Sequence, residues 1–295
     1  MEGSTGQKDK RRFVDAHVHL WDVNMGWYHF PTVENDFGLG DVSTFPARFL
    51  LDDYLAALSA VDIPKFVHVN ATATPQSAAN ETSWLAELAA ARGFPSAIIG
   101  TVDMAATLSS IGRILDREME TPLYRGIRLI GGLDYESGAA LGLLTLLEER
   151  NLVYDAVAHP GGGIAAVAKA AARYPGLPFA IEHSGWPLQA ADPQHWALWK
   201  SEMAELAALP NAYCKLSGLG MTYHRTAPEV FRRYWNYCIE VFGPQRCMFA
   251  SNFPVDSLYG SFDDLLAAFE LVATSLPPDD QAMLFGGTAE QFYRI

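Results

Sequence analysis

The feature that most constrains the fold is a regular alternation of β-rich and helical runs along nearly the whole chain. The first β-rich run begins at Phe13, and the others cover 66–70, 97–102, 124–130, 152–159, 178–183, 212–217 and 247–252. Each is followed by a run with helical character. Strands that alternate with helices form parallel sheets. Eight such units in 295 residues predict a single (β/α)8 TIM barrel.

Two histidines, His17 and His19, stand two positions apart near the end of the first run. Side chains at i and i+2 of a strand point the same way, so both imidazoles are predicted on one face, with Asp15 below them. Ala16 and Val18 would take the other face, toward the helices. A His-x-His pair is a weak signal by itself, because ordinary polar residues also end strands.

Polar residues also gather at the ends of the later runs. Barrel enzymes carry their chemistry at the C-terminal ends of the strands, so these residues predict one active site there. Glu182 is out of phase with its neighbour and is predicted to face the helical layer or a neighbouring loop. His68 is predicted to be a packed or strand-end histidine rather than a ligand. The candidates are Arg128, His159, His183, Lys215, Ser217, Asn252 and Asp256.

A long aromatic segment, 21–49, follows the first run and begins with Trp21. It has no clear period of a strand or helix. Loops of this length in compact domains are usually lids or binding loops, and we expect a lid over the site. The alternative is a surface loop whose aromatic residues form a small core of their own.

Charge and cysteine content narrow the class of protein. The net charge of −13 argues against a nucleic-acid partner, since phosphate binding requires basic patches. Three cysteines without a CxxC pair indicate no disulfide framework and favour a reducing cytoplasm. The N-terminus lacks the apolar core of a signal peptide, and no apolar run is long enough to span a membrane. We expect a mobile tail over 1–12 and one domain over 13–295.

Taken in order, the strand-end segments resemble the amidohydrolase superfamily, of the amidohydrolase-2 type. Within it, they are similar to the branch of sugar-lactone and pyrone-dicarboxylate lactonases. The resemblance runs from about 13 to 292. It is carried by DAHVHLWD at 15–22, GIR at 126–128, IEHSG at 181–185, CKLSG at 214–218 and FASNFPVD at 249–256.

This resemblance implies a distorted barrel with a single active site. In members that use a metal, His17, His19 and His183 would bind one divalent ion such as zinc. An aspartate on the last strand would bind that ion and act as general base. Arg128 would hold a carboxylate or carbonyl of the substrate, and Trp21, Lys215 and Ser217 are further candidates for substrate binding.

The chain departs from that pattern at Asn252, where the resemblance predicts an aspartate. An amide cannot accept a proton as a general base, and it removes an anionic ligand from three neutral imidazoles. We therefore expect a metal that is weakly held or absent. The bases that remain are His159, His183 and Asp256, and the sequence does not choose among them.

The leading hypothesis is a hydrolase that opens a lactone or similar cyclic ester bearing a carboxylate. Arg128 would pair with the anion, and His17, His19 and His183 would polarise the carbonyl, directly or through a metal. His159 or Asp256 would activate water. The alternatives are a decarboxylase or lyase of an unsaturated or aromatic acid, and a ligand-binding barrel that has lost catalysis. The expected partner is a small anionic molecule with a ring or apolar part. The sequence does not decide whether the protein forms a homo-oligomer.

Overall fold

The protein is described here from a computed structural model that covers residues 10–32, 34–58, 61–188 and 192–295. The first nine residues of the expected tail lie outside this range. Arg11 and Arg12, which were also assigned to the tail, already belong to strand β1 (Arg11–Val18) and pair with Val61 and Asp62. The barrel therefore begins two residues earlier than expected.

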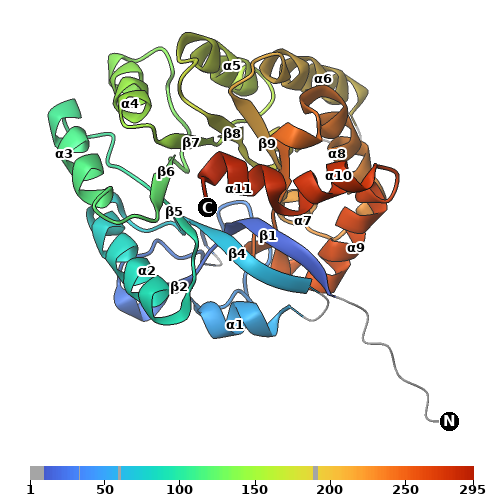
Figure 1. Cartoon of the computed structure of the whole chain (residues 1–295), viewed down its shortest axis with the longest axis horizontal. Coiled ribbons are helices and arrows are strands. Elements are labelled where there is room, and N and C mark those ends of the chain that lie inside the picture. The colour runs from blue at the N-terminus through green and yellow to red at the C-terminus, as the bar shows by residue number, and fades with distance from the viewer. Residues whose placement is uncertain (1–9, 33, 59–60, 189–191) are drawn as a thin grey trace.

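Eight parallel strands of the described chain form one sheet whose order follows the chain (Figure 1). The ring closes between its first and last strands, where the Asn252 amide donates to His17 O at 2.9 Å and the His19 amide donates to Phe253 O at 2.8 Å. The predicted (β/α)8 barrel is confirmed. After β1 the strands are β4 (Val61–Val69), β5 (Ala97–Gly100), β6 (Tyr124–Arg128), β7 (Val153–Ala156), β8 (Phe179–Ile181), β9 (Ala212–Leu216) and β10 (Cys247–Phe249).

Helices surround the barrel and connect its strands (Figure 1). Several begin at a side-chain cap, as at Ser261, whose hydroxyl accepts from the Asp264 amide while the Asp264 carboxylate accepts from the Ser261 amide. The helices are α1 (Leu51–Ala56), α2 (Ala78–Arg92), α3 (Leu108–Glu118), α4 (Gly138–Glu149), α5 (Gly163–Arg173), α6 (Pro193–Ala207), α7 (Leu219–Tyr223), α8 (Pro228–Phe242), α9 (Phe262–Ala273), α10 (Pro278–Ala282) and α11 (Thr288–Tyr293). In the described ranges, none is long and apolar enough to cross a membrane.

The last helical run is interrupted, although the sequence predicts one helix over 278–292. Between α10 and α11 the backbone leaves the helical conformation at Gly286. A Cβ at this position would lie 2.9 Å from Val14 Cγ2 on β1, so only glycine lets the chain pass this close to the strand. The break turns α11 under the barrel, where Phe292 and Tyr293 join the interior cluster that contains Val14.

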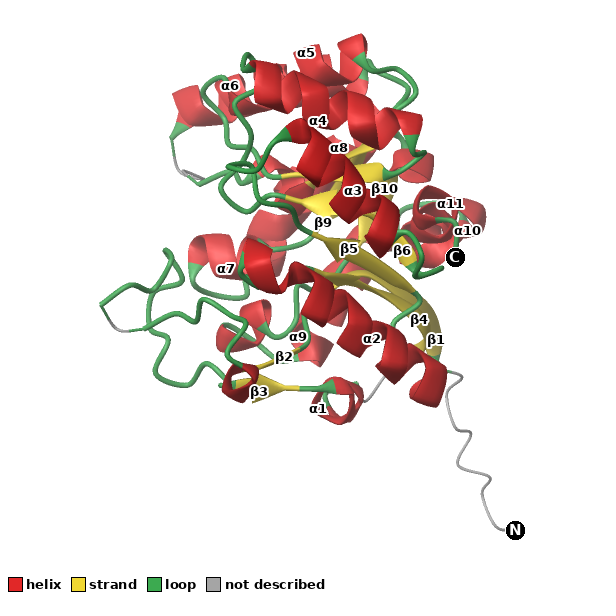
Figure 2. Ribbon diagram, turned by 90° about the vertical axis from the view of Figure 1, so that its left-hand side faces the viewer, coloured by secondary structure: helices red, strands yellow, loops and turns green. Residues whose placement is uncertain are grey.

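The lid lies at the end of the barrel opposite α11. A short antiparallel ribbon of β2 (Trp21–Asp22) and β3 (Arg48–Phe49) forms its base. Figure 2 shows the loops beyond this ribbon on one side of the molecule and α10, α11 and the C-terminus on the other. The barrel thus has a plugged end and an end covered by loops.

The side chains of β1 do not alternate as the sequence predicts. Val14 and Ala16 pack in the barrel interior, whereas Asp15 accepts hydrogen bonds from the Tyr54 hydroxyl of α1 and the Ser251 amide, both at 2.8 Å. The prediction that Asp15 lies below the histidines on their face is therefore wrong. The cause is a shift in the β1–β4 pairing between Asp15 and Val18, which interrupts the two-residue period just before the histidines.

Candidate active site

Three buried imidazoles meet at the loop-covered end of the barrel. His17 and His19 from β1 and its end approach with their Nε2 atoms 3.1 Å apart. The ring of His183, which follows β8, lies with its centroid 4.8 Å from that of His17. The predicted convergence of the first and sixth strand ends is present in the structure.

The surroundings of each ring favour its neutral form. Burial lowers the pKa of all three histidines well below the usual value. The nearby Arg128 lowers it further for all three, and Lys215 does so for His17 and His183. His19 Nδ1 donates to Val69 O at 2.8 Å, which directs the lone pair of its Nε2 into the site.

Glu182 belongs to this cluster, and the prediction that it faces the helical layer or a neighbouring loop is wrong. Its Oε1 lies 3.4 Å from His17 Nδ1, and its Oε2 lies 3.4 Å from Arg128 Nη1. The chain leaves β8 at Ile181 and enters a tight turn in which His183 and Ser184 have φ values of 51° and 56°. Ala180 packs in the barrel interior, so Glu182 continues the interior face of the strand, and the turn brings the next residue, His183, to the same site.

Gly218 leaves the space that His183 occupies. Its φ is +67°, and a Cβ would lie 2.4 Å from Cγ and Nδ1 of the His183 ring. The same ring is fixed by Ser217, whose Oγ is 2.9 Å from Nδ1. The glycine after β9 is therefore a condition for the position of His183.

We expect Gly218→Ala to lower kcat/KM by about tenfold or more, because the new methyl group displaces His183 from the cluster. The backbone penalty at positive φ is about 1–2 kcal/mol. Gly26→Ala is the matched control, since Gly26 has φ +71° and no atom within 4 Å of a built Cβ. Steady-state kinetics and thermal unfolding of both variants make the comparison. Equal activity in the two variants would show that the position of His183 is unimportant.

A second layer of buried charges lies beneath the histidines. Lys215 Nζ is 2.5 Å from Asp155 Oδ2 on β7, 3.2 Å from His17 Nδ1 and 3.8 Å from Glu182 Oε1. The hydroxyl of Tyr293 on α11 donates to Asp155 at 3.0 Å. Lys215 was predicted to bind substrate, but it is fully buried behind His17 and does not line the cavity.

Arg128 does line the cavity, as predicted for a substrate-binding residue. Its Nη1 donates to Glu182, its Nη2 donates to Asn70 O, and its Nε, although buried, has no partner among the described residues. Asn70 is held in turn by Glu81 of α2, whose Oε2 accepts from Asn70 Nδ2 at 2.7 Å. Two nitrogens of the guanidinium are thus anchored, and the third, Nε, is buried without a partner among the described residues.

Asn252 also lines the cavity, at a backbone φ of +57°. Its Oδ1 lies 3.3 Å from His19 Nε2, while its Nδ2 donates to Asp256 Oδ2 at 2.7 Å. Asp256 also accepts from the Met221 amide at 2.8 Å, and burial raises its pKa to about 7. Asp256 is therefore placed behind Asn252 rather than in contact with the cavity.

His159 is set apart from the other histidines. It is exposed, and its ring contacts that of Trp186 with centroids 5.1 Å apart. Trp186 also contacts His183, and the centroids of these two rings are 5.1 Å apart. His159 does not line the cavity, so the structure does not bring it to the site with the other candidates.

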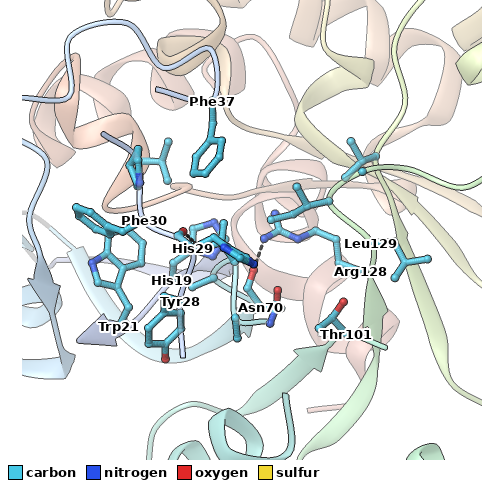
Figure 3. A pocket seen from close by; sticks show the side chains of 18 of the residues that line it. His19, Trp21, Tyr28, His29, Phe30, Phe37, Asn70, Thr101, Arg128 and Leu129 are labelled. Atoms are coloured by element: carbon cyan, nitrogen blue, oxygen red, sulfur yellow. Dashed lines mark hydrogen bonds between the residues drawn. The ribbon is translucent and has the colours of Figure 1, made fainter. Parts of the chain in front are cut away.

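The cavity above these residues has a volume of about 710 Å³. Its polar floor consists of His19, Asn70, Arg128, His183 and Asn252. Aromatic residues of the lid, among them Trp21 and Phe30, form one wall (Figure 3). The indole N–H of Trp21 donates to Pro46 O, and the ring of Trp21 packs against Phe45. The lid segment thus both lines the site and has a small aromatic core.

Sequence reasoning missed four residues that organise this site. Asn70 follows a strand at a position without an obvious role, and Glu81 lies on a helix where an acidic residue usually faces solvent. Asp155 and Tyr293 are separated by 138 residues, so no local pattern connects them. A buried carboxylate inside an apolar strand was the one available signal for Asp155.

The donor set fits a divalent cation. Since His19 Nδ1 donates to a carbonyl and the ring is neutral, its Nε2 carries only a lone pair. Asn252 Oδ1 faces this lone pair without a proton between them, and His17 Nε2 is 3.1 Å away. Imidazole nitrogens and an amide oxygen arranged in this way suit zinc or a similar ion. His17, Glu182 and His183 also have ligand atoms within 4.8 Å of one another.

Comparison with known proteins agrees with the geometry. Residues 14–295 match the family model described as Amidohydrolase. The chain belongs to the amidohydrolase family. This amidohydrolase is 29% identical to an L-fucono-1,5-lactonase of Burkholderia ambifaria, over 96% of this chain and 95% of the relative. It is 31% identical to the Sinorhizobium fredii protein y4mH, over 96% of this chain and 98% of the relative.

Solved structures of other proteins share the fold of this amidohydrolase. A Burkholderia multivorans amidohydrolase with bound zinc is 26% identical and superposes with a TM-score of 0.82, over 96% of this chain and 99% of that one. The 5-carboxyvanillate decarboxylase of Sphingomonas paucimobilis shares the fold, with 16% identity and a TM-score of 0.65 over 97% of this chain and 99% of that one. The family match and the lactonase-named relatives show an enzyme of the amidohydrolase superfamily, as the sequence predicts.

Proposed function

We propose that this amidohydrolase opens a lactone or similar cyclic ester that carries a carboxylate. The observation that carries the proposal is the meeting of neutral histidines with one partly unpaired guanidinium on the floor of a single cavity. Relatives named L-fucono-1,5-lactonase support lactone hydrolysis among the reactions of the family. The expected substrate is a small anion with a ring or apolar part.

Arg128 binds the carboxylate in this proposal. Glu182 and Asn70 hold two of its nitrogens, which fixes the plane of the guanidinium, and the buried Nε has no partner among the described residues. A guanidinium prepared in this way loses little freedom when it receives an anion. The ester group then lies over the histidines and Asn252.

His183 accepts the proton of the attacking water at Nε2 in this proposal. Its neutral ring has the acceptor capacity that an amide lacks, and Ser217 Oγ holds the ring through Nδ1. His159 and Asp256, the other bases considered from the sequence, do not line the cavity.

His17, His19 and Asn252 would hold a divalent ion, and the zinc-bound structural relative supports such a site. When bound, the ion would polarise the carbonyl and lower the pKa of water. Val69 O fixes the ring of His19, and Asp256 fixes the amide of Asn252. These residues orient the donors in advance.

A substrate screen tests the proposed reaction. Purified enzyme is offered lactones with and without a carboxylate and, separately, unsaturated and aromatic carboxylic acids. Hydrolysis is followed by proton release, and decarboxylation by release of carbon dioxide. We expect hydrolysis of carboxylate-bearing lactones. Carbon dioxide release without lactone opening would favour the lyase alternative, and binding without any turnover would favour a barrel that has lost catalysis.

We expect Arg128→Lys to raise KM for a carboxylate-bearing lactone by about tenfold or more, because an ammonium cannot replace a planar fork of donors. kcat should change less, and an uncharged lactone should be almost unaffected. Steady-state kinetics on the two substrates separate these effects. An equal loss for both substrates would mean that Arg128 supports the cavity floor rather than the anion.

A further inference from the structure

The cavity divides sharply into a polar floor and apolar walls. Above the floor, the polar lining residues are Tyr28, His29, Thr72 and Thr101, and Thr72 already donates its hydroxyl to His29 O. The rest of the wall is aromatic or aliphatic, from Phe30 and Phe45 on the lid side to Met104, Leu129, Ile130 and Val157 on the barrel side. Such walls suit a ring or hydrocarbon surface.

A sugar lactone fits this wall poorly. It carries a hydroxyl on most of its carbons, and each hydroxyl that leaves water without a new partner costs about 1–3 kcal/mol. The volume of about 710 Å³ also lies well within the range that holds drug-sized ligands, ~300–1,000 Å³. A single carboxylate-bearing ring on the floor leaves most of this space for another part of the substrate.

Phe37 is the lid residue that lines this remaining space while staying exposed. Its side chain lines the cavity, yet 49% of its surface is exposed, and φ is +55°. A bulky residue rarely adopts this conformation, which persists only where the surroundings enforce it. Figure 3 shows Phe37 extending from the lid loop toward the cavity.

The turn around Phe37 explains how this conformation is maintained. The Asp36 carboxylate accepts from the Gly38 and Gly40 amides at 2.9 and 3.0 Å. His224 Nε2 donates to Gly38 O at 3.0 Å and joins the turn to the end of α7. The backbone that carries the exposed ring is thus held by these hydrogen bonds. Ile130, 47% exposed, is a second large apolar residue that lines the cavity without being covered.

We propose that the substrate joins its carboxylate-bearing cyclic ester to a planar apolar group of about two rings, which Phe37 covers from the lid side. The ester and carboxylate occupy the floor, and the apolar group occupies the space between the lid and the wall at Leu129 and Ile130. Polar sugar lactones are then poor substrates. The inference rests on the proposed function for the reacting group, whereas the apolar subsite rests on the cavity itself.

The first test is kinetic and uses Phe37 variants. The substrates are a γ-lactone carboxylate bearing a naphthyl group, the same lactone without it, and L-fucono-1,5-lactone. We expect kcat/KM for the naphthyl lactone to exceed that for the sugar lactone by about a hundredfold. Phe37→Ala should raise KM for the naphthyl lactone about tenfold and leave the unsubstituted lactone unchanged, and Phe37→Tyr should retain wild-type values. Leu198→Ala, at a 43% exposed apolar residue of α6 outside the cavity, is the control.

The second test does not require turnover. Calorimetry measures binding of 2-naphthoate and of acetate to the wild type and to Phe37→Ala. Tight, Phe37-dependent binding of naphthoate without lactone hydrolysis would overturn the proposed reaction and keep the apolar subsite. Lactone hydrolysis with a preference for the sugar lactone, or with no effect of Phe37→Ala, would overturn this inference and keep the reaction. Failure of naphthoate to bind more tightly than acetate also overturns it.

Discussion

Lys215→Met is expected to lower the free energy of unfolding by about 3–5 kcal/mol, the usual effect of removing one partner from a buried ion pair. Lys215 and Asp155 are fully buried, and their charged atoms are 2.5 Å apart. Without the ammonium, Asp155 keeps only the Tyr293 hydroxyl among its described partners, and Glu182 keeps Arg128. Urea denaturation followed by fluorescence measures the loss.

Two further variants make the result specific. Lys65→Met removes a partly exposed lysine that is 2.8 Å from Glu290, and it should cost less than about 1 kcal/mol. Adding Asp155→Leu to Lys215→Met removes the stranded carboxylate and should recover part of the stability. Activity should stay low in the double variant, because His17 has lost one of the two groups that contact its Nδ1. A Lys215→Met protein as stable as the wild type would refute the pairing.

Exchanging Asn252 and Asp256, through Asn252→Asp combined with Asp256→Asn, is expected to tighten zinc binding at least tenfold. The exchange keeps the net charge and the hydrogen bond between the two side chains, which are now 2.7 Å apart. It moves the negative charge from behind the site to the position that faces His19. An anionic oxygen is a better zinc ligand than an amide oxygen.

Competition with a chromogenic chelator measures the dissociation constant in the wild type, the exchange variant and Asn252→Leu. The leucine variant should bind zinc more weakly than the wild type. Asn252→Asp alone should gain less than the exchange, because it sets two carboxylates side by side. An unchanged dissociation constant in the exchange variant would exclude residue 252 from the metal site.

Near-stoichiometric zinc in wild-type enzyme purified without added metal, with activity lost on chelation, would contradict the expectation of a weak or absent metal.

The barrel and the convergence of its strand ends could be predicted because both depend on local rules. Alternation of strands and helices is a short-range pattern, and parallel strands bring their C-terminal ends to one face. His17, His19, Arg128, His183 and Asn252 therefore reach one site without any knowledge of distant contacts. The lid could also be predicted, because the segment 21–49 is too long and too aromatic for a simple connection.

The errors arose where the backbone departs from regular strand geometry. The shifted pairing in β1 placed Asp15 against α1, whereas Glu182 lies two residues after Ala180, which packs in the barrel interior, and the left-handed turn that follows brings His183 to the same site. Phase arguments assume an uninterrupted strand, so the side of Asp15 was mispredicted, and counting back from His183 across the turn assigned the wrong face to Glu182. Contacts such as Asp155 with Tyr293 depend on how remote elements meet, and no spacing in the sequence records them.

The path of α11 sets an order in which the site becomes complete during synthesis. Asp155 and Lys215 leave the ribosome well before Tyr293, which donates to Asp155 from beneath the barrel. Until that helix has emerged and docked, the pair that supports His17 lacks one of its hydrogen bonds, and the interior around Val14 is uncovered. Domains fold as units as their sequence becomes available. The environment of His17 and the other histidines is therefore complete only once Tyr293 has emerged and docked beneath the barrel.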